Sequence, residues 1–330
     1  TWGLGGVFEK SNGTLTISQT NLALSGNSTL TSDEALTSDE ALSFVNLKLN
    51  DNTLTLGSST SDLTVQNAIT LDTSTEGILT GGADLKVEGD VTLANGKLKS
   101  DNGTLIFRNG VTQSGSFEFD LGASDLTVEG DVTLANSGKL ESTSGELIFR
   151  QGVTQSGSSE FDLGVSTLYL GADYTKSSGN LLSSSATLDL LVDLAITSDS
   201  ALSFNQLNLN NLTLTLGSES SDLQVSSALI LDNSNERVMT GPADLSLLAF
   251  QDISIGGVTS TGGTISLLAG GQLSGAGILD VSGSTWTLGG VFEKSNGTLT
   301  ISQTNLALSG NSTLTSDEAL SLCRIHTTPF

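Results

Sequence analysis

The chain has 330 residues, of which 36 are acidic and 12 are basic, so its formal net charge at pH 7 is −24. Phosphate contacts need clustered Lys and Arg, and the scattered basic residues here argue against nucleic-acid binding. A single cysteine, Cys323, rules out an intramolecular disulfide. No apolar run reaches the length of a membrane-spanning helix, so we expect no membrane insertion within this chain.

The first stretch of the chain is a repeat that returns near its end. Thr1–Leu36 reappears as Thr285–Leu320 with one difference, Gly3 against Thr287. The second occurrence follows ordinary strand-and-turn text, whereas the first has no such lead-in. We therefore expect the chain to be an excerpt of a longer repeat array.

Two further duplications lie between these copies. Ser38–Leu85 matches Ser198–Leu245, and Asp84–Ser124 is followed directly by its own copy, Asp125–Ser166. The offsets of the three duplications agree on one unit of about 20–21 residues, which is typical of a solenoid. Each coil of a solenoid buries its apolar face only against neighbouring coils, so the array is one domain however long it runs.

Within each unit, apolar and polar residues alternate. Leu54 and Leu56, or Val91 and Leu93, enclose a threonine, and this two-residue period is typical of a strand with one face turned inward. Asn-Gly and Ser-Gly pairs between the strands supply the sharp corners. No stretch keeps a helical period, so we expect very little helix.

These features predict an all-β fold, a parallel β-helix (β-solenoid) with about 20–21 residues per coil, two or three strands per coil and roughly sixteen coils. The right-handed form is favoured, because parallel crossovers are almost always right-handed. Residues 1–320 are expected to form the continuous array, and residues 321–330 an irregular tail outside the repeat. Successive coils are expected to open with Leu85, Leu105, Leu126, Leu147, Leu168, Leu188, Leu207, Leu223, Leu245, Ile265 and Trp286.

Clustered carboxylates in the tandem repeat are the candidates for catalysis on a polysaccharide. They are Glu88/Asp90, Glu129/Asp131, Glu118/Asp120 and Glu160/Asp162, with Arg108 and Arg150 between them. They recur at the repeat period, as structural positions do, whereas a catalytic site occurs once. Cys323 and His326 cannot complete a zinc site or a nucleophilic Cys–His arrangement, because the chain has no other Cys or His. We therefore expect no enzyme and assign no catalytic, cofactor-binding or metal-binding residue.

Two ligand-binding alternatives stay open. Carboxylates one residue apart, such as Glu88 and Asp90, point to the same side of a strand and could share Ca²⁺ with a neighbouring coil. Neither the nonapeptide calcium repeat nor an EF-hand loop is present. Threonine pairs resemble the surface of ice-binding solenoids, although their spacing does not follow the coil period. These pairs are Thr14/Thr16, Thr29/Thr31, Thr53/Thr55, Thr213/Thr215, Thr298/Thr300 and Thr313/Thr315.

Gly262–Leu288, together with recurring GTLTIS and LTLG phrases, resembles the β-strand-repeat text of filamentous-haemagglutinin-like and autotransporter adhesins, the passenger regions of large bacterial surface proteins. The resemblance covers residues 1–320. It implies a secreted or cell-surface β-helix used for adhesion or as a structural stalk, and we expect a non-enzymatic rod. Its partner would be a receptor or glycan on a host or neighbouring cell, or further copies joined end to end into filaments. A polysaccharide-active β-helix enzyme and an ice- or calcium-binding surface are the alternatives.

Overall fold

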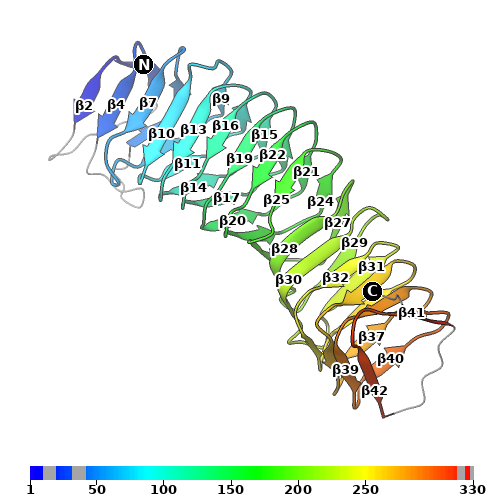
Figure 1. The fold of residues 1–330 in the computed structure, drawn as a ribbon. Coiled ribbons are helices and arrows are strands. Elements are labelled where there is room, and N and C mark those ends of the chain that lie inside the picture. Colours follow the sequence, from blue (N-terminus) through cyan, green and yellow to red (C-terminus); the bar gives the residue numbers. More distant parts are fainter. Residues whose placement is uncertain (10–19, 32–41, 318–323, 328–330) are drawn as a thin grey trace. The chain divides into compact units, whose positions relative to one another are not determined.

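The computed structural model describes residues 1–9, 20–31, 42–317 and 324–327. Every regular element in this part of the chain is a β-strand, and the strands form a parallel β-solenoid of about 14 turns with roughly 21 residues per turn (Figure 1). The predicted fold class is confirmed. The sixteen coils that we expected are too many, because some turns are longer than the assumed unit. Leu22 lies opposite Leu47, and Leu54 lies opposite Ile78.

The chain divides into two compact units. The first contains Thr1–Tyr169 and Ser178–Leu182, and the second contains Leu170–Ser177 and Ser183–Phe330. Strand β23 (Thr167–Leu170) contains one boundary between them. A regular turn has three short strands, and the corresponding strands of successive turns pair into parallel sheets that run along each unit.

In the first unit the sheets are named here by their first and last strands. The β5–β20 sheet contains β5 (Leu42–Phe44), β8 (Leu63–Val65), β11 (Leu85–Val87), β14 (Thr104–Phe107), β17 (Asp125–Val128) and β20 (Glu146–Phe149). The β9–β21 sheet contains β9 (Ile69–Leu71), β12 (Val91–Leu93), β15 (Val111–Gln113), β18 (Val132–Leu134) and β21 (Val153–Gln155). The β2–β25 sheet contains β2 (Val7–Glu9), β4 (Ser28–Thr31), β7 (Thr53–Leu56), β10 (Gly77–Gly81), β13 (Lys97–Ser100), β16 (Glu118–Asp120), β19 (Lys139–Glu141), β22 (Glu160–Asp162) and β25 (Asn180–Leu182). A short sheet contains β1 (Trp2–Leu4), β3 (Asn21–Leu24) and β6 (Asn46–Lys48).

The second unit is built in the same way. The β26–β43 sheet contains β26 (Thr187–Leu190), β28 (Leu202–Asn208), β30 (Leu223–Ile230), β32 (Leu245–Leu247), β35 (Thr264–Leu267), β38 (Thr285–Leu288), β41 (Asn305–Leu308) and β43 (Arg324–Thr327). The β24–β40 sheet contains β24 (Tyr174–Lys176), β27 (Leu194–Ser198), β29 (Thr213–Leu216), β31 (Arg237–Gly241), β34 (Gly257–Ser260), β37 (Ile278–Asp280) and β40 (Thr298–Thr300). The β33–β42 sheet contains β33 (Gln251–Ile253), β36 (Gly271–Leu273), β39 (Val291–Lys294) and β42 (Thr313–Ser316).

The core is a stack of inward side chains, one layer per turn. Leu105 lies opposite Leu126, which lies opposite Leu147, and all three are fully buried. The residues between inward positions face outward, as the two-residue period predicts. Each fully buried leucine contributes about 1.5–3 kcal/mol relative to an exposed one. The stacked core therefore carries the stability of a chain that has no disulfide.

One step of the predicted ladder is wrong. Leu207 is followed in its ladder by Leu229, not by Leu223. Leu223 instead lies opposite Leu202 on one side and Leu245 on the other. The long strands β28 and β30 each carry two ladders, one in each half, with an irregularity in register between the halves. Both ladders satisfy the same alternation, so the alternation alone cannot tell them apart.

Each unit contains a break at which one sheet ends and another begins. In the second unit, the half-strand 228–230 pairs with β28 only, and β33, the next strand along that face, starts the separate β33–β42 sheet. In the first unit, β6 ends the short sheet and β9 starts the β9–β21 sheet. No backbone pairing joins β6 to β9 in the described residues.

Residues 324–327 differ from the irregular tail that we expected for 321–330. They form β43, in which Ile325 lies opposite Leu306 of β41. A parallel ladder needs only backbone groups, so a stretch outside the repeat can still extend the sheet. Cys323 and the other residues of this tail lie outside the described part of the chain.

Candidate functional site

Aspartates that precede the first strand of a turn hold the backbone of the next turn. The Asp84 carboxylate accepts a hydrogen bond from the backbone N–H of Thr104 at 2.7 Å, and Asp125 accepts one from Glu146 at 2.8 Å. The same contact joins Asp62 to Asp84, Asp222 to Asp244, and Asp244 to Thr264. Hydrogen bonds to a carboxylate are stronger than those between neutral groups. These inter-turn caps give part of the acidic excess a structural role.

In the first group of candidate catalytic carboxylates, Glu88, Glu129 and Asp131 are engaged in contacts within or between turns. Glu129 lies between two arginines, 3.1 Å from Arg108 one turn before it and 3.7 Å from Arg150 one turn after it. The Glu88 carboxylate lies 2.5 Å from the ammonium group of Lys86, two residues before it in the same turn. Asp131 accepts a hydrogen bond from the backbone N–H of Gly152 at 3.1 Å.

In the second group, Asp120, Glu160 and Asp162 are engaged in contacts within or between turns. The Lys139 ammonium contacts Glu141 at 2.9 Å and Glu160 at 3.1 Å, so one lysine links two turns. Lys99 contacts Asp120 at 2.7 Å. Asp162 accepts a hydrogen bond from the backbone N–H of Gly164 at 3.1 Å. These six carboxylates therefore make contacts distributed over successive turns, and they do not gather in either of the grooves described below.

The proton affinities of these lysines follow from their contacts. Hydrogen bonds from its ammonium to Glu141 and Glu160 raise the pKa of Lys139. The hydrogen bond to Asp120 raises the pKa of Lys99. Both ammonium groups stay charged at neutral pH, so neither can serve as a general base.

Two lysines of the second unit are buried, with their charged ends at a carboxylate of the next turn. Lys176 is 3% exposed, and its ammonium donates hydrogen bonds to Asp199 and Ser200. Lys294 is also 3% exposed and contacts Asp317 at 2.8 Å. These contacts hold the pKa of each aspartate below its usual value. Because each contact joins adjacent turns, the pairs fix the stacking of the turns.

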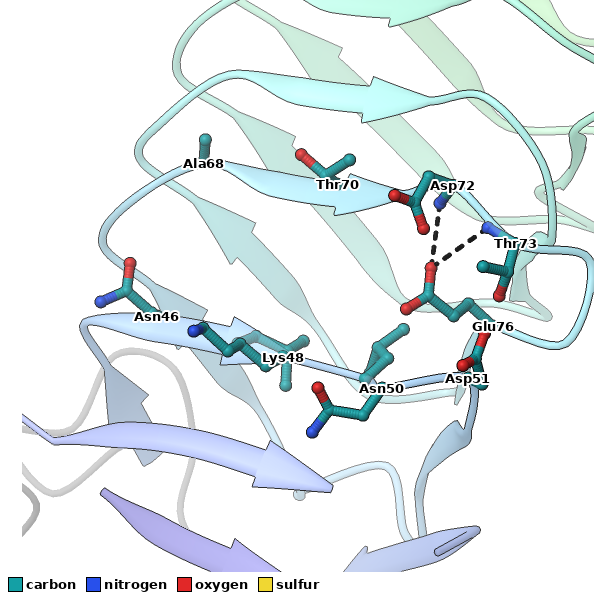
Figure 2. Close-up of a pocket in the computed structure, with 11 residues that line it drawn as sticks. Asn46, Lys48, Asn50, Asp51, Ala68, Thr70, Asp72, Thr73 and Glu76 are labelled. Atoms are coloured by element: carbon teal, nitrogen blue, oxygen red, sulfur yellow. Dashed lines mark hydrogen bonds between the residues drawn. The ribbon is translucent and has the colours of Figure 1, made fainter. Parts of the chain in front are cut away.

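A polar groove of about 430 Å³ lies between β6 and β9, where backbone pairing is interrupted (Figure 2). Lys48 and Asn50 line one wall, and Thr70 and Asp72 line the other. The buried carboxylate of Glu76 closes its end. The groove brings together the carboxylates of Asp51, Asp72 and Glu76 and the ammonium group of Lys48, and the Glu76 carboxylate is held by backbone hydrogen bonds.

Glu76 has a structural partner set that the duplicated segment repeats. Its Oε2 accepts backbone hydrogen bonds from Asp72 at 2.9 Å and Thr73 at 3.4 Å, which closes the turn (Figure 2). Glu236, at the same place in the second copy, accepts backbone hydrogen bonds from Asp232, Asn233 and Asn211. The carboxylate therefore organises a corner in both copies.

The calcium and thiol hypotheses find no support in the described residues. Nowhere in 1–9, 20–31, 42–317 and 324–327 do three or more His, Cys, Asp or Glu side chains gather in a geometry that could hold a metal ion. Glu88 and Asp90, the pair considered for calcium, are part of this search. Cys323 lies outside the described residues, and His326 belongs to β43.

The predicted threonine pairs do not form one ladder. Thr29 lies opposite Thr55, but Thr55 is followed by Leu79, and Thr213 lies opposite Arg237. Thr14/Thr16 lie outside the described residues. A different, single file does form in the first unit, on the outward centre of the β9–β21 sheet. It contains Thr70, Thr92, Thr112, Thr133 and Thr154, one per turn.

A second groove was not predicted from the sequence. It measures about 250 Å³ and lies between the end of β30 and β33, at the ladder break of the second unit. Its lining combines apolar side chains, including Ile230, Leu231 and Phe250, with the polar side chains of Gln251, Asp252 and Ser254. The available signal was a divergence between the duplicated segments: directly after the matched text, Glu88 and Asp90 of the first copy correspond to Leu248 and Phe250.

Comparisons with known proteins identify no relative of this chain: no family model, curated protein or solved structure matches it. Among the described residues, no helix is long and apolar enough to cross a membrane. The fold, the contacts of the acidic side chains and the two grooves are therefore the features that bear on function.

Proposed function

We propose that this protein is a non-enzymatic structural and adhesive β-solenoid of the bacterial cell surface or the extracellular space. The observation that carries the proposal is that acidic side chains of this protein link adjacent turns. Glu129 between Arg108 and Arg150, and the aspartate caps such as Asp84, link one turn to the next at the repeat period. Carboxylates that recur at the repeat period in this way serve the stacking of the turns, whereas a catalytic pair occurs at one place along the array.

The proposed mechanism is geometric. Backbone ladders and inter-turn ion pairs join each turn to its neighbours. Outward side chains at equivalent positions are therefore repeated at the strand spacing of about 4.8 Å. Many weak, identical contacts can then act together on a cell-surface receptor or glycan. The resemblance of the sequence to bacterial surface adhesins supports the extracellular location.

The test is attachment of coated beads to cells. Beads carrying the purified chain should attach to epithelial or bacterial cells in a saturable way that free protein competes for, whereas albumin-coated beads should not. Treating the cells with glycosidases or with protease distinguishes a glycan from a protein receptor. Attachment no greater than that of albumin-coated beads on every cell type would contradict the adhesive role.

The alternative of a polysaccharide-active enzyme has its own readout. Incubation with a panel of bacterial and plant polysaccharides should release no reducing ends. Release that is lost in Glu129→Gln or Glu160→Gln, with the fold retained, would show that a periodic carboxylate is catalytic. That result would replace the proposed function.

A further inference from the structure

The corner of the second unit that leads into the β33–β42 sheet exposes an apolar patch. The side chains of Phe250, Leu268 and Val291 are 57%, 42% and 48% exposed. Gln251 lies opposite Gly271, which lies opposite Phe292, so these corners stack in successive turns. Exposed apolar side chains that gather in one place on a highly charged protein mark an interaction surface more often than isolated ones do.

The second groove, whose lining is partly apolar and partly polar, adjoins this patch. Ala228, Ile230 and Leu231 line one wall, and Phe250 and Gln251 line the other. Phe250 therefore belongs both to the patch and to the groove. We call Ala228, Ile230, Leu231, Leu248, Phe250, Leu268 and Val291 the Phe250 surface.

The duplicated segment shows that the solenoid does not need these apolar residues at this corner. Glu88 and Asp90 stand in the first copy where Leu248 and Phe250 stand in the second. In the first copy, Glu88 contacts Lys86 at the solvent-exposed corner. The corresponding turn of the first copy therefore folds with a charged corner, so folding of such a turn does not require an exposed phenylalanine.

The groove also has two open strand edges. Residues 228–230 pair with β28 on one side, and no pairing joins their other side to a strand in the described part of the chain. β33 pairs with β36, and its opposite side faces the groove in the same way. Unpaired backbone N–H and C=O groups at a strand edge can receive an added strand.

The charges around the Phe250 surface are negative. Asp252 lies opposite Gln272, which lies opposite Glu293, and both acids are exposed on the outward face of the β33–β42 sheet. The two basic residues between 228 and 317 are engaged elsewhere: Arg237 donates to backbone carbonyls, and Lys294 contacts Asp317. A matching partner must therefore be apolar at its centre and positively charged at its ends.

We propose that the Phe250 surface binds an extended peptide segment whose alternating apolar residues are flanked by Lys or Arg. The segment adds as a strand to an open edge at the break between β30 and β33. Its apolar side chains contact Ile230 and Phe250, and its basic flanks pair with Asp252 and Glu293. The acidic rim disfavours an anionic membrane surface, and it also disfavours a second copy of this acidic chain.

This inference goes beyond the scaffold role and is tested separately from cell attachment. The probe is a fluorescein-labelled synthetic peptide in which valine and threonine alternate between terminal lysine pairs, measured by fluorescence anisotropy on the purified chain. We expect saturable binding that Phe250→Asp weakens at least about tenfold, as for a central anchor residue. Leu268→Asp should also weaken it. Val165→Asp, which places the same change at an exposed valine far from the groove in the sequence, should leave it unchanged.

Three further peptides define the mode of binding. Glutamate in place of the lysine pairs should weaken binding, and methylation of alternate backbone amides should abolish it, because a methylated amide cannot donate to the strand edge. A photo-reactive phenylalanine analogue at the centre of the peptide should crosslink to residues of β30 or β33. Circular dichroism and thermal melting of Phe250→Asp should match those of Val165→Asp, so that a loss of binding cannot be ascribed to unfolding.

Several results would contradict peptide binding at the Phe250 surface. No saturable binding, equal binding by Phe250→Asp, or equal binding by the methylated peptide would each overturn the proposal. Co-sedimentation of the parent chain with phosphatidylcholine vesicles that is lost in Phe250→Asp would show a lipid-binding patch instead. Sedimentation analysis that shows a dimer lost in Phe250→Asp would show that a second copy occupies this surface.

Discussion

Replacing Leu126 by aspartate should destabilise the first unit by several kcal/mol. Leu126 is fully buried and stacks between Leu105 and Leu147 of the adjacent turns. Loss of a buried leucine side chain costs about 2–5 kcal/mol, and an unsatisfied buried polar group adds about 1–3 kcal/mol. Protonation of the new carboxyl group limits the cost of burying a charge. A total of about 5 kcal/mol is therefore expected from these two contributions.

The matched control is Thr127→Asp in the same strand, because Thr127 is the outward neighbour. We expect a change within about 1 kcal/mol there. The measurement is urea denaturation followed by far-UV circular dichroism. Because repeat arrays can unfold in parts, hydrogen exchange should accompany it and should show lost protection in β14, β17 and β20. A denaturation midpoint of Leu126→Asp equal to that of Thr127→Asp would refute the inward assignment.

Three further predictions concern the contacts between and within turns. Asp84→Ala should lower the denaturation midpoint more than Asp84→Asn, because asparagine keeps an oxygen that can accept from Thr104; equal midpoints would count against the inter-turn cap. Glu236→Ala should cost more stability in chemical denaturation than Glu76→Ala, since Glu236 accepts backbone hydrogen bonds from three residues and Glu76 from two; the reverse order would contradict the assigned roles. Hydrogen bonding to Lys176 lowers the pKa of Asp199 in the folded state. The pair therefore stabilises the fold at pH values above the usual aspartate pKa of about 4. This stabilisation is lost as the pH falls through the lower pKa of Asp199 in the folded state. Thermal melts between neutral and strongly acidic pH should therefore show a smaller acid loss for Lys176→Met than for the parent chain, and an equal loss would argue against the pair.

The number of residues per turn and the identity of the inward-facing side chains were predictable because both follow directly from repeats and alternation in the sequence. The tandem copies Asp84–Ser124 and Asp125–Ser166 fix the unit length, and alternation around Leu105 and Leu126 fixes which side chains point inward. The structural role of the periodic acids was also predictable in kind, because a position that recurs with every unit serves the unit. Their individual partners, such as Arg150 for Glu129, depend on the stacking register.

The ladder switch and the grooves were not predictable from local patterns. In β28 both Leu202 and Leu207 satisfy the inward alternation, and the choice of partner is made by the register of neighbouring turns. A groove forms at a ladder break because two strands of adjacent turns do not pair there. No local sequence pattern predicts such a missing pairing. The exchange of Asp90 for Phe250 between the copies was visible, but its meaning depends on the open edge beside it.

The most direct test of the central claim, that successive turns stack at the strand spacing, is a distance between Thr70 and Thr154. Both belong to the outward threonine file of the first unit and lie four turns apart, with Thr92, Thr112 and Thr133 between them. Both cysteines are introduced into one chain, Thr70→Cys and Thr154→Cys, in which Cys323→Ser removes the native thiol. Spin labels are attached to them, and double electron–electron resonance measures the distance between the labels. Stacking predicts a narrow distribution centred near about 19 Å, four steps of the strand spacing. A broad distribution centred well beyond about 30 Å, as for a chain that does not return on itself, would contradict the solenoid.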